Sequence, residues 1–235
     1  MRPTFKIACS RFQEEELSIK QKVIAIDGPS ASGKGTVALR VAQALGFDYL
    51  DSGALYRLTA LYAEKRGVGW RNEEAVAQLA ENLPVRFEET RIMLNDEDVS
   101  VQIRSEAIGM GASAIAQLPK VRAALLQRQR DFLTEKGLVA DGRDMGSVVF
   151  PDAVLKVFLT ASAQVRAQRR ARQLGLPCEG VEFDRILSDI EARDEADRRR
   201  PVAPLRQLPD AVLLDTTDLG IEESVKKVLD WYRKL

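Results

Sequence analysis

The chain has 235 residues, and 35 Lys plus Arg are balanced by 35 Asp plus Glu, so its formal net charge is zero. This balance argues against a general nucleic-acid binder, which needs surplus cations to neutralise phosphates. The chain contains no histidine, which excludes a Ser-His-Asp triad, a histidine metal site and an imidazole general base. Cys9 and Cys178 are too few for a zinc cluster or a disulfide framework, and they fit a reducing cytosol.

Residues 1–21 are expected to form a polar, poorly ordered extension. Their scattered basic residues resemble the start of a signal peptide, but the apolar run at 5–9 is too short and three glutamates follow at 14–16. No apolar run in the chain approaches the ~18 residues that span a bilayer. We therefore expect a cytoplasmic protein without a membrane partner.

The chain then begins in the pattern of an α/β domain. Residues 22–26 are short and β-branched and precede a glycine turn, which predicts a buried strand. Residues 36–45 carry apolar side chains at every fourth position, which predicts a helix that stops at Gly46. A second strand at 47–50 and a helix at 55–66 follow. Strand, glycine-rich turn, helix and strand form the start of a βαβ fold.

The pattern changes after residue 69. A short helix is predicted at 73–82, and two apolar stretches at 85–87 and 92–94 around a polar turn predict an antiparallel hairpin. We interpret residues 70–118 as an insert on the parallel core. A helix is expected over 121–136, with a cation in its last turn before Gly137.

The core is predicted to resume with three strands and a final helix. The strands are expected at 138–140, 154–159 and 211–214. The final helix is expected at 221–231, with Ile221, Val225, Val228 and Leu229 facing inward. A charged helical stretch, broken near residue 175, lies between the last two strands.

Residues 28–36 match the P-loop pattern up to its lysine and lie between a predicted strand and a predicted helix. Small residues let the backbone curl so that several N–H groups point at one phosphate, and the helix adds its positive end. Lys34 supplies a full charge for the β- and γ-phosphates. Gly35 follows Lys34 where Ser or Thr is usual, so Thr36 is the expected Mg²⁺-side group, directly or through water. The residues expected to bind ATP are Gly28, Pro29, Ser30, Ala31, Ser32, Gly33, Lys34, Gly35 and Thr36. The alternative is a glycine-rich turn without a ligand.

A second phosphate site is predicted beyond the carboxyl ends of the same strands, where ligands gather in open α/β sheets. Asp51 and Ser52 open the helix that carries Arg57, and Arg143 follows a later strand. Arg57, Arg122 and Arg143 are candidates for a clamp, because guanidinium groups match phosphate oxygens bidentately. Arg57 is alternatively an ordinary solvated arginine, and Arg122 an ordinary helix residue.

Several motifs together resemble the bacterial-type cytidylate kinase family. They are Asp-Gly-Pro-Ser at 27–30, Asp-Ser-Gly-Ala-Leu-Tyr-Arg at 51–57, Val-Arg at 121–122, Asp-Gly-Arg-Asp-Met-Gly at 141–146 and Pro-Val-Ala-Pro-Leu at 201–205. The resemblance runs from about residue 22 to the C-terminus. It implies transfer of the ATP γ-phosphoryl group to CMP or dCMP, with Mg²⁺ accompanying ATP.

The same resemblance implies a P-loop fold with a five-stranded parallel sheet, flanking helices, a small α+β insert and a helical lid. The core takes 22–69, 119–161 and 201–235, the monophosphate-binding insert takes 70–118, and the lid takes 162–200. We expect a monomer whose partners are ATP and CMP or dCMP.

The residues that the resemblance and the second-site motif assign to CMP are Asp51, Ser52, Tyr56, Arg57, Ser113, Arg122, Arg143, Asp144, Arg193, Asp197 and Arg200. Among them, Ser113 and Arg122 match positions that contact the cytosine edge. Residues 193, 197 and 200 match lid positions, and their spacing places them on one helical face. Asp144 alternatively pairs with Arg143 or a nearby lysine. The groups expected to act in catalysis are Lys34, Arg143, Asp144, Arg166 and Arg169.

Two other interpretations stay open. The lid stretch is rich in arginine and acidic residues but has no lysine, and such a run is often a solvated helix face. The function is alternatively that of another small-molecule kinase, acting on AMP, UMP or shikimate. A P-loop regulatory protein would need a guanine-reading motif such as Asn-Lys-x-Asp, which the chain lacks.

Overall fold

The computed structural model describes residues 22–88 and 91–235, so the predicted extension at 1–21 lies outside the described residues. The chain divides into two compact units. Among the described residues, unit 1 contains those up to Leu50 together with Phe132–Arg199 and Ala203–Leu235. Unit 2 contains Asp51–Asp131 and Arg200–Val202. No helix among the described residues is long and apolar enough to cross a membrane.

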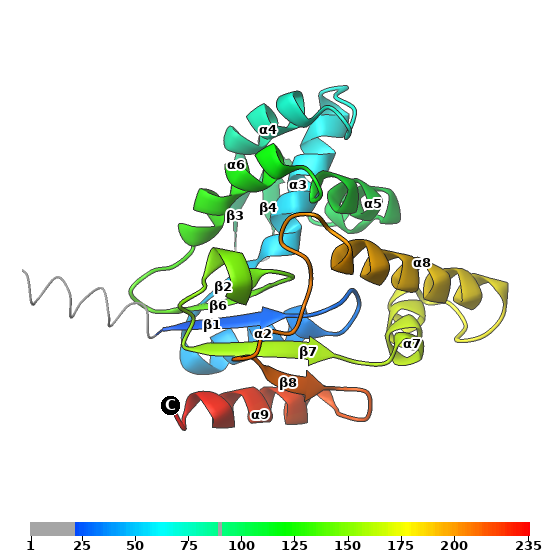
Figure 1. Ribbon diagram of the computed structural model, residues 1–235. Coiled ribbons are helices and arrows are strands. Elements are labelled where there is room, and N and C mark those ends of the chain that lie inside the picture. Colours follow the sequence, from blue (N-terminus) through cyan, green and yellow to red (C-terminus); the bar gives the residue numbers. More distant parts are fainter. Residues whose placement is uncertain (1–21, 89–90) are drawn as a thin grey trace, which may run out of the picture. The chain divides into compact units, whose positions relative to one another are not determined.

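Unit 1 is built on a five-stranded sheet, as predicted (Figure 1). Its strands, in spatial order, are β2 (Asp48–Asp51), β6 (Leu138–Gly142), β1 (Val23–Asp27), β7 (Leu155–Thr160) and β8 (Val212–Asp215). The strand β1 pairs in parallel with β6 and β7, and β7 pairs in parallel with β8. All five residues of β1 are buried, as expected for the centre of a parallel sheet.

Two helices, α2 (Lys34–Leu45) and α9 (Ile221–Tyr232), cover this sheet with one hydrophobic core. Val41 and Val228 are fully buried in that core. The prediction for α9 was wrong at Ile221, whose exposed fraction is 47%. Ile221 is the first residue of the helix, where only one turn of backbone is available to cover a side chain.

The charged stretch of unit 1 forms two helices, α7 (Ala163–Leu174) and α8 (Val181–Arg198). Gly175 ends α7 in a left-handed conformation, with φ of 69°. Ala167, Ala171, Phe183 and Ile190 form a small core between the two helices. The arginine-rich stretch is therefore a packed helical pair with one apolar side.

Unit 2 contains the helices α3 (Ser52–Lys65), α4 (Glu73–Glu81), α5 (Glu106–Ile115) and α6 (Pro119–Arg130), with a short 3₁₀ turn at Gln102–Arg104. Its three-stranded sheet has the order β3 (Val85–Phe87), β4 (Ile92–Leu94) and β5 (Glu97–Asp98). The antiparallel pairing of β3 with β4 confirms the predicted hairpin.

The helix predicted over 121–136 ends earlier, at Arg130. Residues 134–137 instead form a turn in unit 1. The N–H of Gly137 donates to the Thr134 carbonyl at 3.1 Å, and the Thr134 hydroxyl donates to the Asp48 carboxylate at 2.5 Å. Lys22 also donates to the Glu135 carbonyl at 2.8 Å. This local turn and the contacts to Asp48 and Lys22, which are distant in sequence, replace the helical hydrogen bonds that the local pattern predicted.

Gly28 lies where the backbone passes very close to strand β7. A Cβ atom on Gly28 would be 2.0 Å from the carbonyl oxygen of Leu159. Because that oxygen belongs to the sheet backbone, a side chain at this position forces the strands apart. The absence of a side chain is therefore what lets the chain leave β1 beside β7.

We predict that Gly28→Ala lowers the free energy of unfolding by about 2 kcal/mol or more, in the range found for overpacked cores. Urea denaturation measures this change. Gly69→Ala is the matched control, because a Cβ there meets no atom within 4 Å. Equal unfolding midpoints for the two variants would contradict the close approach.

Candidate active site

The predicted P-loop connects β1 to α2 in unit 1, which is the strand–loop–helix context that the motif requires. Ala31 and Gly33 have positive φ angles of 57° and 88°. Residues in this left-handed region turn successive N–H groups toward one centre and form a concave anion site. Lys34 is the first residue of α2, so the positive end of the helix faces the same loop.

Three cationic side chains donate to carbonyl groups of this loop. Lys34 Nζ lies 3.3 Å from the Pro29 oxygen, Arg166 Nη1 lies 3.0 Å from the Ser30 oxygen, and Arg169 Nη1 lies 3.1 Å from the Ser32 oxygen. Both arginines come from α7. The loop therefore combines inward N–H groups with a surrounding ring of positive charge, which suits a polyphosphate.

Two buried carboxylates on α8 hold two of the predicted arginines. Asp194 accepts from Arg166 Nη2 at 2.6 Å, and Asp197 accepts from Arg143 Nε at 2.6 Å. Arg143 also donates through Nη2 to the Ser30 hydroxyl at 2.9 Å. Burial acts to lower the pKa of Arg143, but the carboxylates of Asp197, Asp141 and Asp194 together outweigh it, and the pKa is raised. The guanidinium therefore keeps its charge next to the loop.

The sequence analysis missed Asp194, which is as buried as Asp197 and three residues before it. Its spacing from Asp197 within an arginine-rich helix was the available signal, because residues i and i+3 share a helix face. Arg193 lies on the same helix and is half-buried. Unit 1 thus brings together Lys34, Arg143, Arg166, Arg169 and Asp197 around the loop.

Asp144 is buried directly after Arg143, where one turn of π-helix begins at Met145–Val149. Such wide turns are rare and are found mostly at functional sites. The sequence analysis did not predict this turn. The turn fixes the backbone immediately after the two predicted phosphate-site residues.

The P-loop and its first helical turn also fit Mg²⁺ carried with ATP. Ser32 has a buried hydroxyl oxygen without a hydrogen-bond partner in the described part of the chain. Thr36 is exposed in the first turn of α2, and hydroxyl oxygens are suitable ligands for Mg²⁺, which keeps several waters. The residues present therefore fit the predicted co-substrate and its metal.

The remaining predicted residues belong to unit 2. Arg57 donates to the carbonyl groups of Ile103 at 3.0 Å and Ser105 at 3.4 Å. Arg122 donates to the Ala116 carbonyl at 3.2 Å, and its guanidinium lies 5.9 Å from the centre of the Tyr56 ring. Unit 2 thus places Tyr56 and Arg122 together.

Four further predicted residues occupy other places in unit 2. Asp51 is the N-cap of α3 and accepts from the Ala54 N–H at 3.0 Å, and Ser52 is buried beside it. Ser113 is half-buried in α5. Arg200 is buried but lies beyond the last residue of α8, Arg198. The prediction that Arg200 shares a helical face with residues 193 and 197 was therefore wrong.

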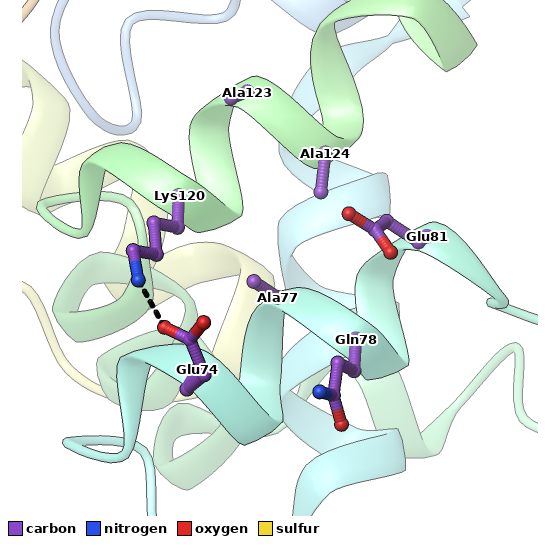
Figure 2. Close-up of a pocket in the computed structure, with 7 residues that line it drawn as sticks. All are labelled: Glu74, Ala77, Gln78, Glu81, Lys120, Ala123 and Ala124. Carbon is purple, nitrogen blue, oxygen red and sulfur yellow. Dashed lines mark hydrogen bonds and ion pairs between the residues drawn. The ribbon is translucent and has the colours of Figure 1, made fainter.

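A cavity of about 460 Å³ lies between α4 and α6 of unit 2 (Figure 2). Its polar lining includes Glu74 and Glu81, and Lys120 forms an ion pair with Glu74. None of the residues predicted to bind a nucleotide lines this cavity. Two carboxylates against one paired ammonium disfavour a phosphate, so we assign no nucleotide site to it.

Comparison with known proteins gives a consistent result. A sequence model described as "Cytidylate kinase" matches residues 24–234. A cytidylate kinase of Neisseria meningitidis is 76% identical over 216 residues, covering 92% of this chain and 99% of that protein. A cytidylate kinase of Chromobacterium violaceum is 60% identical, covering 90% and 96%. A gluconokinase structure from Sinorhizobium meliloti is 18% identical with a TM-score of 0.47, covering 91% and 93%. The sequence matches show that the chain belongs to the cytidylate kinase family, and it is a phosphotransferase.

Proposed function

We propose that this protein transfers the γ-phosphoryl group of ATP to CMP and to dCMP, forming ADP and the corresponding diphosphate. The observation that carries the proposal is a P-loop surrounded by Lys34, Arg166 and Arg169 in a member of the cytidylate kinase family. Phosphoryl transfer depends mainly on positioning and charge neutralisation. Those are the two properties that a ring of fixed cations supplies.

The donor nucleotide is proposed to bind through the P-loop. The backbone N–H groups and Lys34 hold the β- and γ-phosphates, and Thr36 faces Mg²⁺. When bound, Mg²⁺ neutralises charge on the phosphates. Arg166 and Arg169 exchange their carbonyl contacts for contacts with the phosphoryl group, because an anion attracts a guanidinium more strongly than a neutral carbonyl does.

The acceptor is proposed to bind through two sets of residues. In unit 1, Arg143 and Asp197 form an ion pair at 2.6 Å, and Asp144 and Arg193 are the other members of the set. In unit 2 the members are Asp51, Ser52, Tyr56, Arg57, Ser113, Arg122 and Arg200. The motif pattern of the family supports both sets. Arg57, Arg122, Arg143 and Arg200 orient the phosphate, and Ser113 and Arg122 contact the cytosine edge.

The reaction needs no strong base. An oxygen of the CMP phosphate attacks the γ-phosphorus in line, and the bond to the oxygen bridging the β- and γ-phosphates breaks, leaving ADP. A phosphate monoester is largely dianionic at neutral pH, since its second pKa is about 6. The attacking oxygen therefore carries no proton, and the absence of histidine from the chain is compatible with this chemistry.

The protein is further proposed to work as a cytoplasmic monomer. Its substrates are small, diffusible nucleotides, and every group assigned to ATP lies within unit 1 of a single chain. A second chain would supply nothing that the donor site needs.

We predict that ADP release depends on the acceptor. With ATP and Mg²⁺ held constant, CMP and dCMP are expected to release ADP much faster than UMP, AMP or shikimate. A coupled assay of ADP measures each rate. Fastest turnover with AMP or shikimate would assign the protein to another kinase activity, and slow hydrolysis that ignores every acceptor would favour a regulatory nucleotide-binding protein.

We predict that Lys34→Ala and Arg143→Ala separate the two sites. Lys34→Ala is expected to lower kcat about 100-fold or more, by analogy with other losses of one charge-stabilising donor. Arg143→Ala is expected to weaken CMP binding and to spare ATP binding, because the hydrogen bond from Arg143 to the P-loop reaches the Ser30 side chain and not the backbone groups that hold the phosphates. Calorimetric titration of each nucleotide distinguishes them. Equal loss of both nucleotides in Arg143→Ala would remove this residue from the acceptor site.

A further inference from the structure

Asp27 is a buried carboxylate at the end of β1, immediately before the first residue of the P-loop. Its two oxygens accept hydrogen bonds from two consecutive backbone N–H groups. Oδ1 lies 2.8 Å from the Met145 nitrogen, and Oδ2 lies 2.9 Å from the Gly146 nitrogen. Each carboxylate oxygen is therefore matched to one donor of the same short segment.

That segment is the π-helical turn that follows Arg143 and Asp144. Its wide hydrogen bonds run from the Val149 N–H to the Asp144 carbonyl at 3.2 Å and from the Phe150 N–H to the Met145 carbonyl at 2.7 Å. The first N–H groups of a helical turn have no partner within the turn. Asp27 supplies that partner for two of them, so it fixes where the turn begins.

The residue before Arg143, Gly142, is also held by the end of β1 and the start of the P-loop. The Gly28 N–H donates to the Gly142 carbonyl at 3.3 Å, and Asp27 is in register with Gly142 in the parallel pairing of β1 and β6. Residues 142 and 145 are thus both anchored to positions 27 and 28. Arg143 and Asp144 lie between these anchors, so their backbone is fixed relative to the start of the P-loop.

We propose that Asp27 is a positioning residue for phosphoryl transfer: its ionised carboxylate fixes Arg143 and Asp144 relative to the P-loop, and its protonation releases them and slows the reaction. The proposal rests on the proposed function, because it assigns the acceptor phosphate to Arg143. It adds a control of that site by pH in a chain that contains no histidine.

The surroundings of Asp27 set the pH at which it takes up a proton. Burial raises the pKa of Asp27 from 3.8 to about 6, against the opposing effect of the Gly146 and Met145 N–H groups. Asp144 raises this pKa further, and Lys34 at the start of α2 lowers it. The residues beside Asp27 on the neighbouring strands, Gly142 and Phe158, carry no charge. Protonation therefore occurs at mildly acidic pH.

A proton on Asp27 changes its hydrogen bonding at one oxygen. That oxygen becomes a neutral hydroxyl group, which is a weaker acceptor than a carboxylate oxygen and must direct its own O–H elsewhere in a buried site. Its hydrogen bond to the backbone N–H is therefore weakened. Asn at this position carries no charge at any pH, and its NH₂ group replaces one acceptor oxygen, so Asp27→Asn lacks the ionised carboxylate at every pH.

The test compares kcat of the wild type and Asp27→Asn at saturating ATP and CMP from about pH 5 to about pH 8. CMP titrates in the same range, but it does so for both enzymes, so the ratio of the two rates isolates the residue. At about pH 8 the variant is expected to be about tenfold slower, since small displacements of reacting groups have effects of this size or larger. At about pH 5 the ratio is expected to fall below about two, because the wild type is then also protonated.

Asp210→Asn is the matched control. Asp210 is an exposed carboxylate of unit 1 that pairs with Lys156 at 2.6 Å, and it belongs to neither proposed site. Its rate relative to the wild type is expected to stay near one at every pH. A rate ratio for Asp27→Asn that is the same at all pH values, or that equals one throughout, would overturn the proposal while wild-type CMP phosphorylation stands.

A melting curve separates this effect from a loss of folding. The raised pKa means that the folded chain binds the Asp27 proton more tightly than the unfolded chain does. The stability from this group is therefore fully present below about pH 4 and is lost as pH rises through about 6. Asp27→Asn is accordingly expected to melt no lower than the wild type at about pH 8, although it is slower there.

Hydrogen exchange of the wild type tests the same inference without a variant or a substrate. After correction for the intrinsic pH dependence, the amides of Met145 and Gly146 are expected to lose protection by about tenfold between about pH 7.5 and about pH 5. Strand β7 is expected to show no such loss. Unchanged protection at residues 145 and 146 would overturn the proposal even if the enzyme phosphorylates CMP as proposed.

Discussion

A loop that curls its N–H groups inward must turn its carbonyl groups outward, and this constraint organises unit 1. The positive φ angles of Ala31 and Gly33 produce the curl. The carbonyl groups of Pro29, Ser30 and Ser32 then need donors, because unsatisfied backbone oxygens in a folded protein are costly. Lys34, Arg166 and Arg169 supply those donors. The groups that satisfy the outside of the loop are therefore the same cations that a polyphosphate on its inside requires.

Carboxylates can hold these arginines in place only if they leave some of the guanidinium N–H groups available to the loop. Asp194 and Asp197 meet this requirement from one face of α8, at 2.6 Å from Arg166 and Arg143 respectively. Buried ion pairs of this kind add little net stability, since desolvation offsets their attraction. Their value here is geometric: each carboxylate binds one edge of a guanidinium and leaves other N–H groups directed at Ser30. Unit 2 uses backbone in the same way, because Arg122 donates to the Ala116 carbonyl at the negative end of α5.

The sequence was sufficient where local pattern and tertiary structure agree. The β-branched run at 23–26 and the glycine loop after it predicted β1, the P-loop and α2, because burial and turn geometry act there over neighbouring residues. The sequence was insufficient where contacts between residues far apart in the chain determine the local structure. The turn at residues 134–137 forms because Thr134 bonds to Asp48, which no local pattern records. Arg200 fits a helical spacing, but the helix ends before it. The pairing of Arg166 with Asp194 joins α7 to the next helix, α8, and the periodicity of either helix alone could not predict it.

Asp27 shows that a motif does not reveal what each of its residues does. In the sequence it is the first residue of the Asp-Gly-Pro-Ser motif, at the end of an apolar strand, and no local pattern indicates which groups its side chain contacts. Its role arises only when β1 and the segment after β6 lie side by side and two N–H groups meet two oxygens. Burial of that carboxylate opposes folding at neutral pH, as its raised pKa requires. A neutral amide would avoid that cost but would leave one donor unmatched, and the segment carrying Arg143 and Asp144 would lose an anchor. The charge on Asp27 is thus explained by its effect on the position of Arg143 and Asp144, and not by a contribution to the stability of the fold.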